Sequence, residues 1–235
     1  MTKKEDMITP LKEQSKRSAA EIFAAFEYQW DCFVLMLLKE NDDTVTVSFE
    51  IRDDVDVQYE DNTILYQIKH SVQKNARGET INLSNRDADL WKTISTWMKF
   101  IDEDSDVLEK SSFILVTNKN ISKNKFVKAL ESFARDNNVD NLKATLITVR
   151  DDERTKLENS TDTAKKKGVD ISKVINELLG KNYLYEFCNR ISVSKTSDLL
   201  KEDIKRLMSM QLDMFGMNYV MTTFNGSWAN EMNRH

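Results

Sequence analysis

The sequence predicts an α/β domain in which helices flank a mixed central sheet. Runs of apolar residues with helical spacing alternate along the chain with short runs that have the character of strands. Only five Gly and one Pro occur among 235 residues, which favours long regular elements over a turn-rich all-β fold. A hydrophobic fraction of 40% provides enough apolar surface for a core and excludes wholesale disorder.

Helices are predicted where apolar residues recur three and four positions apart. The clearest helix begins after Ser18, a suitable N-cap that forms a capping box with Glu21. Gly180 is the expected C-cap of a short helix, and residues 150–168 are expected to form a solvated helix or loop. The predicted helices span residues 18–39, 86–101, 122–136, 170–179 and 197–215.

Strands are predicted where β-branched residues alternate with polar ones or where short apolar runs are continuous. The predicted strands span residues 44–51, 54–58, 63–69, 111–117, 142–149 and 183–193. Asp61 and Asn62 form a favourable two-residue turn between the second and third of these strands. The hairpin register that follows pairs Glu60 with Thr63, Val57 with Tyr66, Asp56 with Gln67, and Asp54 with Lys69.

This hairpin places several polar side chains on one face of the sheet. Because side chains alternate along a strand, the shared face carries Asp54, Asp56, Gln67 and Lys69. Glu50 joins them if the preceding strand continues through Ile51. Charge clustered in this way is unfavourable unless it is compensated, and a divalent cation is a suitable compensating group. An edge hairpin with solvent-facing acids is the structural alternative.

The net charge of −5 argues at first against a general nucleic-acid binder. The acids are concentrated, however, because residues 40–62 contain nine acidic residues and one basic residue. Residues 63–78 then hold Lys69, Lys74 and Arg77 with no acid. Either run alone is typical of a solvated face. An acidic block next to a basic one is typical of metal sites that cut phosphodiesters.

The two cysteines and the absence of a long apolar segment predict a cytoplasmic protein. Cys32 and Cys188 lie far apart within apolar runs, so we expect core thiols in a reducing cytosol. The most apolar stretch is interrupted by Glu27 and Asp31, which argues against a membrane span. The first six residues lack the apolar region of a signal peptide.

An ordered set of short motifs carries a resemblance to a known nuclease superfamily. The motifs are Phe26-Glu27-Tyr28-Gln29, Glu50, residues 53–57 (DDVDV), residues 66–71 (YQIKHS), residues 89–94 (DLWKTI) with Trp97, and residues 113–118 (FILVTN). Over most of residues 18–193 the chain resembles the PD-(D/E)xK superfamily in its Gln-x-Lys form. More narrowly, it is similar to nuclease effector domains of bacterial anti-phage systems of the CBASS and Lamassu type, most of all the Lamassu nuclease subunit. The resemblance implies a restriction-endonuclease-like sheet.

The resemblance also implies roles for individual residues. Asp54 would be the main metal-binding carboxylate, with Asp56 as the alternative if the alignment shifts by two residues. Gln67 and the Ile68 carbonyl would be further ligands of Mg²⁺, for which Mn²⁺ would substitute. Lys69 would position or deprotonate the attacking water and stabilise charge on the phosphate. Glu50, or Glu27 from the first helix, would add negative charge.

Two positions depart from the family pattern. Asp53 stands where the superfamily has proline, and Gln67 stands where many relatives have an acid. Among the basic residues, Lys69, Lys74 and Arg77 would contact the DNA backbone, although for Lys74 and Arg77 a flexible solvated loop is the alternative. His70 would contact a phosphate, although a structural histidine is the alternative.

The function implied is a metal-dependent endonuclease that cuts double-stranded DNA with little sequence specificity once it is released or oligomerised. Its expected partners are an SMC-like ATPase sensor subunit, a small accessory subunit and further copies of itself. The expected organisation is an N-terminal extension over residues 1–17, a nuclease domain over 18–200, and a C-terminal helix and tail over 201–235. That tail is either an oligomer or docking segment or a last core helix with a frayed end. A catalytically inactive interaction module and an RNA or single-strand nuclease are the alternative functions.

Overall fold

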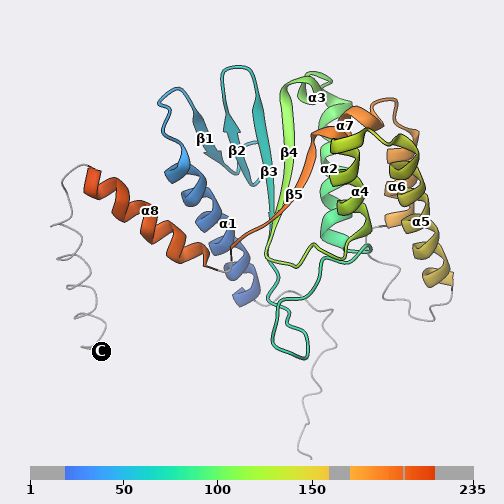
Figure 1. The fold of residues 1–235 in the computed structure, drawn as a ribbon, viewed down its shortest axis with the longest axis horizontal. Coiled ribbons are helices and arrows are strands. Elements are labelled where there is room, and N and C mark those ends of the chain that lie inside the picture. The colour runs from blue at the N-terminus through green and yellow to red at the C-terminus, as the bar shows by residue number, and fades with distance from the viewer. Residues whose placement is uncertain (1–18, 159–169, 198, 215–235) are drawn as a thin grey trace, which may run out of the picture.

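The chain forms a five-stranded mixed sheet with helices on both faces, which confirms the predicted α/β class (Figure 1). The computed structural model describes residues 19–158, 170–197 and 199–214. In chain order the elements are α1 (Ala19–Lys39), β1 (Thr46–Phe49), β2 (Val55–Gln58), β3 (Thr63–Lys69), α2 (Ala88–Glu103), α3 (Asp106–Lys110), β4 (Ser111–Thr117), α4 (Lys125–Asp136), α5 (Val139–Glu158), α6 (Ile171–Gly180), α7 (Leu184–Arg190), β5 (Ile191–Lys195) and α8 (Leu200–Met214).

The strands follow one another across the sheet in chain order, β1-β2-β3-β4-β5. The first three are antiparallel neighbours, whereas β3, β4 and β5 run parallel to one another. The two parallel pairings require crossovers, which α2 with α3 and then α4 to α7 provide. The central strand β3 is therefore hydrogen-bonded on both edges.

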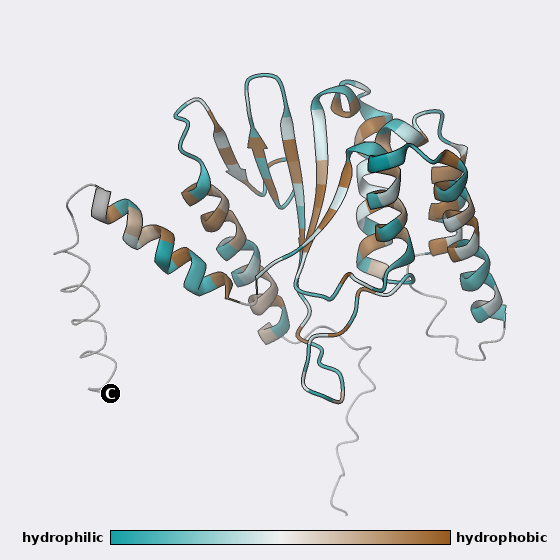
Figure 2. Ribbon diagram, viewed as in Figure 1, coloured by the Kyte–Doolittle hydropathy of each residue, from teal (hydrophilic) through white to brown (hydrophobic). Residues whose placement is uncertain are grey.

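Each face of the sheet has its own hydrophobic core. On one face, α1 and α8 cover a smaller cluster that includes Cys32, Val55 and Ile68. On the other face, α2, α4 and α7 cover a larger cluster that includes Trp97 and Phe113. The apolar segments of the strands and of the helices that cover them are visible in Figure 2.

Both cysteines are buried, as the apolar runs around them predicted. Cys32 and Cys188 are 1% exposed and form no disulfide. Burial raises the pKa of each thiol to about 12, so neither is a reactive thiolate near neutral pH. None of the described helices combines the length and apolar composition needed to cross a membrane.

The hairpin between β2 and β3 has a different register from the one predicted. The observed pairs are Val55 with Tyr66, Asp56 with Leu65, Val57 with Ile64 and Gln58 with Thr63. The Tyr59 N–H donates to the Asn62 carbonyl at 2.8 Å, which makes Glu60 and Asp61 the turn residues instead of Asp61 and Asn62. Because the shift is two residues and the side-chain period is two, every side chain remains on its predicted face.

Two predicted strands are helices. Residues 142–149 belong to α5, where Leu142, Leu146 and Val149 are fully buried at helical spacing. Residues 184–190 form α7, which buries Leu184 and Phe187, and only the end of the predicted strand is extended, as β5. In both segments the short apolar run is compatible with the helical period and with the strand period. Packing against the neighbouring helices stabilises the helix.

Several element ends also differ from the predictions. The first strand stops at Phe49, so Glu50 is not part of it. Gly180 is the last residue of α6 and Lys181 is the C-cap. Helix α3 was not predicted. Residues 150–158 are helical, one of the two predicted outcomes, and continue α5. The predicted N-cap Ser18, the extension over residues 1–17 and the tail beyond residue 214 lie outside the described residues.

Adjacent residues of α5 test the helical assignment. Leu146 is fully buried, whereas its neighbour Ile147 is 40% exposed. We expect Leu146→Ala to lower the free energy of unfolding by about 2–5 kcal/mol because it leaves a cavity, and Ile147→Ala to lower it by less than about 1 kcal/mol. Urea denaturation measures both values. Equal losses would contradict the assigned face of α5.

Candidate active site

A tight loop between β1 and β2 holds the first acidic residues of the site. Glu50 follows the last residue of β1 and has a φ of 55°, a left-handed conformation that is costly for a residue with a Cβ. Its N–H donates to the Asp54 carbonyl oxygen at 3.1 Å, which closes the loop. The reversal pairs Phe49 with Val55 and brings Asp54 to the start of β2.

The Asp54 carboxylate is held against the end of β3. Its Oδ2 accepts a hydrogen bond from the Ile68 N–H at 2.6 Å. The same oxygen lies 3.7 Å from the Lys69 Nζ. Both side chains are partly buried, at 12% exposure for Asp54 and 28% for Lys69, so solvent reaches the pair only in part. The structure therefore places together the two residues to which the resemblance assigns the main chemical roles.

Glu50 and Gln67 lie at the same end of the sheet. Burial raises the pKa of Glu50, the Asp54 charge raises it further, and the Lys69 charge lowers it. These three groups are thus within electrostatic reach of one another. Gln67 is 9% exposed, and within the described residues its side-chain amide makes no hydrogen bond. Its oxygen is available as a ligand.

Asp53 holds the loop from the side of the core, a role that the sequence alone did not reveal. Its Oδ2 accepts the Trp97 indole N–H at 2.7 Å, and its Oδ1 accepts the Asp54 N–H at 2.9 Å. Trp97 is fully buried on α2. A buried indole N–H needs an acceptor, and Asp53 provides it. The position of Asp53 next to the candidate metal ligand Asp54 is the signal in the sequence that could have suggested a role for it.

Asp56 has a separate environment, although it points to the same face as Asp54. It is 3% exposed, lies opposite Leu65, and its Oδ1 accepts the Arg52 N–H at 3.4 Å. Within the described residues, Lys69 has its ion pair with Asp54 and not with Asp56. The geometry favours Asp54 as the carboxylate of the site. Ile68 has its side chain in the opposite core, so it offers the site only backbone groups.

The predicted nucleic-acid contacts divide into two groups. The His70 ring packs against Tyr28 of α1 with 4.7 Å between ring centroids, and desolvation lowers its pKa. This is the environment of a structural histidine. Lys74 and Arg77 are exposed in the loop after β3 and line a polar hollow. Glu27, proposed as an additional acid, pairs instead with Lys201 of α8 at 2.6 Å.

The donor set suits a hard cation. In the part of the chain that the structure describes, no group of three or more His, Cys, Asp or Glu is arranged to bind a metal. The oxygen donors at the site are the Asp54 and Glu50 carboxylates, the Gln67 amide and the Ile68 carbonyl. Mg²⁺ commonly uses one or two carboxylates and completes its shell with water and phosphate oxygens. These residues fit that ion, and the thiol or imidazole ligands that Zn²⁺ usually takes are not among them.

No family model matches the chain, and a search of the curated proteins finds no match. Support for a function therefore comes from the residues of the site and from the motifs of the sequence.

The partly buried carboxylate of Asp53 predicts a pH-dependent stability. Burial raises its pKa from 3.8 to about 6, so the folded state binds this proton more tightly than the unfolded state does. The stability that it contributes is present below pH 4 and is lost as the pH rises through about 6. From pH 4 to 7, we expect the unfolding free energy of wild type to fall by about 2 kcal/mol relative to Asp53→Asn.

Urea denaturation in EDTA at a series of pH values measures this difference. Asp106→Asn is the control, because Asp106 is exposed and a hydrogen bond from Lys110 lowers its pKa, which gives the opposite sign. A difference between wild type and Asp53→Asn that does not change with pH would contradict the assigned burial of the charge.

Proposed function

We propose that this chain is a metal-dependent endonuclease that cuts double-stranded DNA and acts as the effector subunit of an anti-phage defence complex. The observation that carries the proposal is the Asp54 carboxylate held between the Ile68 N–H and the Lys69 ammonium at the end of β3. This arrangement places a carboxylate that can bind a metal ion next to a cation that can stabilise charge on a phosphate, a combination suited to metal-assisted hydrolysis of a phosphodiester.

Different side chains would have different roles in the reaction. Asp54, Glu50, Gln67 and the Ile68 carbonyl would hold Mg²⁺. The bound ion would supply Lewis-acid stabilisation of the phosphate. Lys69 would orient a water for attack on phosphorus and donate hydrogen bonds to the oxygens that gain charge as the P–O bond to the leaving oxygen breaks. Asp53 holds the Asp54 backbone in place through its Oδ1.

The fold and the surface support the proposal further. The five-stranded mixed sheet flanked by helices agrees with the restriction-endonuclease-like architecture that the sequence resemblance implies. Exposed apolar residues on α1 suit an enzyme that works with partner subunits or with other copies of itself. They are Ile22 (59%), Phe23 (68%), Phe26 (50%) and Trp30 (48%). We propose an SMC-like ATPase and a small accessory subunit as these partners.

A non-catalytic interaction module is the second candidate. It is favoured by the charge pairing that Asp54 already has with Lys69. This candidate predicts that DNA or a partner protein binds without being cut.

Cleavage of supercoiled plasmid with Mg²⁺ or Mn²⁺ tests the proposed activity. We expect Lys69→Ala and Asp54→Asn each to reduce cleavage by about 10²-fold or more, because each removes a group that stabilises the transition state. Lys110→Ala is the matched control, because its exposed pair with Asp106 lies at the other end of the sheet.

Undiminished cleavage by Lys69→Ala and Asp54→Asn would contradict the site. If wild type alone, concentrated or combined with its partner subunits leaves the plasmid intact, the interaction module is favoured.

A further inference from the structure

A large polar hollow lies beside the candidate active site, at the ends of the parallel strands. Its volume is about 840 Å³, and its lining comes from the loop after β3, the segment after β4 and the end of β5. The lining residues are Lys74, Asn75, Ala76, Arg77, Glu79, Thr80, Asn82, Asn118, Asn120, Lys123 and Lys195.

The hollow is basic although the chain as a whole is acidic. Four cations line it, against the single acid Glu79, while the chain carries a net charge of −5. Glu79 accepts a hydrogen bond from the Asn75 Nδ2 at 2.9 Å, so its charge is engaged inside the loop. Lys123 and Lys195 were not among the predicted nucleic-acid contacts. They come from segments far apart in the sequence, and only the fold brings them to Lys74 and Arg77.

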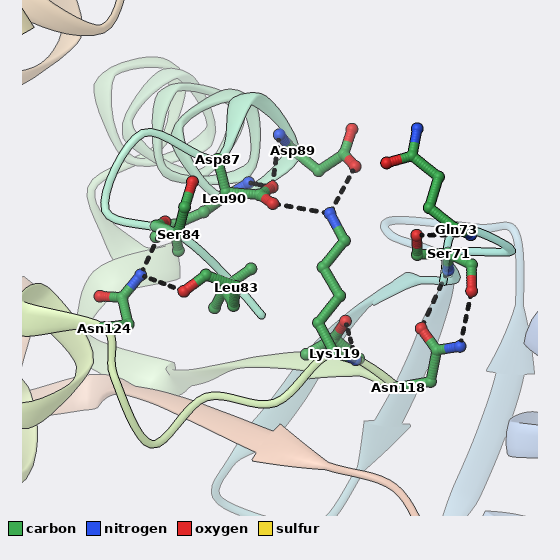
Figure 3. A network of polar contacts seen from close by, with 11 residues as sticks. Ser71, Gln73, Leu83, Ser84, Asp87, Asp89, Leu90, Asn118, Lys119 and Asn124 are labelled. Carbon is green, nitrogen blue, oxygen red and sulfur yellow. Dashed lines mark hydrogen bonds and ion pairs between the residues drawn. The ribbon is translucent and has the colours of Figure 1, made fainter. Parts of the chain in front are cut away.

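The walls of the hollow are held in place by backbone and amide contacts. The Ser71 N–H donates to the Asn118 Oδ1 and the Asn118 Nδ2 donates to the Ser71 carbonyl, both at 2.9 Å (Figure 3). The loop is tied a second time where Asn82 forms a parallel bridge with Asn120. At its tip, the Asn75 Oδ1 accepts the N–H groups of Arg77 and Glu79. These contacts therefore hold the loop that carries Lys74 and Arg77 against the segment after β4.

The strand register connects the hollow to Lys69. Lys69 pairs with Thr117 across β3 and β4, and Thr117 pairs with Lys195 across β4 and β5. Residues paired in this way lie in one row and point to the same face, with about 5 Å between adjacent strands. The backbone positions of Lys69 and Lys195 are thus about 10 Å apart on one face of the sheet.

The chemistry of the lining favours phosphates over bases. Cations and side-chain amides are the groups that contact a nucleic-acid backbone, and they give no sequence information by themselves. Binding of single strands commonly relies on aromatic platforms for stacked bases. No aromatic residue is among those that line the hollow within the described part of the chain.

We propose that this hollow binds the phosphodiester backbone of duplex DNA beside the phosphate held at Lys69, with Lys123 and Lys195 as contacts in addition to Lys74 and Arg77. The inference rests on the proposed function, because it treats the DNA in the hollow as the substrate of that site. It accounts for binding with little sequence specificity by an acidic protein, since the contacts are local and directed at the backbone.

Binding of a labelled random-sequence duplex in EDTA tests the proposal without any need for cleavage. We expect Lys123→Gln and Lys195→Gln each to weaken binding by about 3- to 10-fold and to reduce the slope of log affinity against log salt by about 1. Lys173→Gln, an exposed lysine on α6 away from the hollow, should change neither quantity. Circular dichroism checks that the exposed substitutions leave the fold intact.

The outcomes separate this inference from the proposed function. If Lys123→Gln and Lys195→Gln reduce the salt slope but wild type never cuts DNA, the hollow is supported as a DNA site and the nuclease function is contradicted. If wild type cuts DNA but the two variants leave the salt slope unchanged, the nuclease function is supported and the hollow is contradicted as a DNA site. A single strand of the same length that binds more tightly than the duplex would overturn the assignment of duplex DNA.

Discussion

The hydrogen bond from the Ile68 N–H to the Asp54 carboxylate is the contact on which the candidate site depends. At 2.6 Å it joins the short loop after β1 to the central strand β3. Because β3 is paired on both edges, the position of Lys69 is set by the whole sheet. The loop conformation, with Glu50 in the left-handed region, then brings a carboxylate to that fixed lysine.

Three acids of the acidic block, Asp53, Asp54 and Asp56, are buried or partly buried at this end of the fold. Asp53, Asp54 and Asp56 each have a specific donor, from Trp97, Ile68 and Arg52 respectively. A buried ion pair between Lys119 and Asp87, with Asp89 nearby, ties the end of β4 to the start of α2 (Figure 3). Burying a charge is costly unless it is paired or hydrogen-bonded. Compensation by these donors explains how the fold tolerates the acids that it removes from solvent.

The sequence predicted the sheet better than the connections around it. Strand alternation put Asp54, Gln67 and Lys69 on the correct face even though the turn was misplaced, because a shift of two residues preserves the face. The sequence could not distinguish helix from strand for residues 142–149 or 184–190, because packing against other elements determines the secondary structure there. The sequence also could not reveal the Asp53–Trp97 contact or the presence of Lys123 and Lys195 in one hollow, because both depend on how distant elements pack and no local period encodes them.

Paramagnetic broadening of backbone amide signals by Mn²⁺ tests most directly whether Asp54 is the carboxylate of a metal centre at the end of β3. In the full chain, the account predicts that substoichiometric Mn²⁺ broadens the amide signals of Glu50, Asp54 and Ile68 first, and that Asp54→Asn abolishes this selectivity. Broadening that is confined to exposed acids elsewhere, such as Asp42 and Asp106, would contradict it.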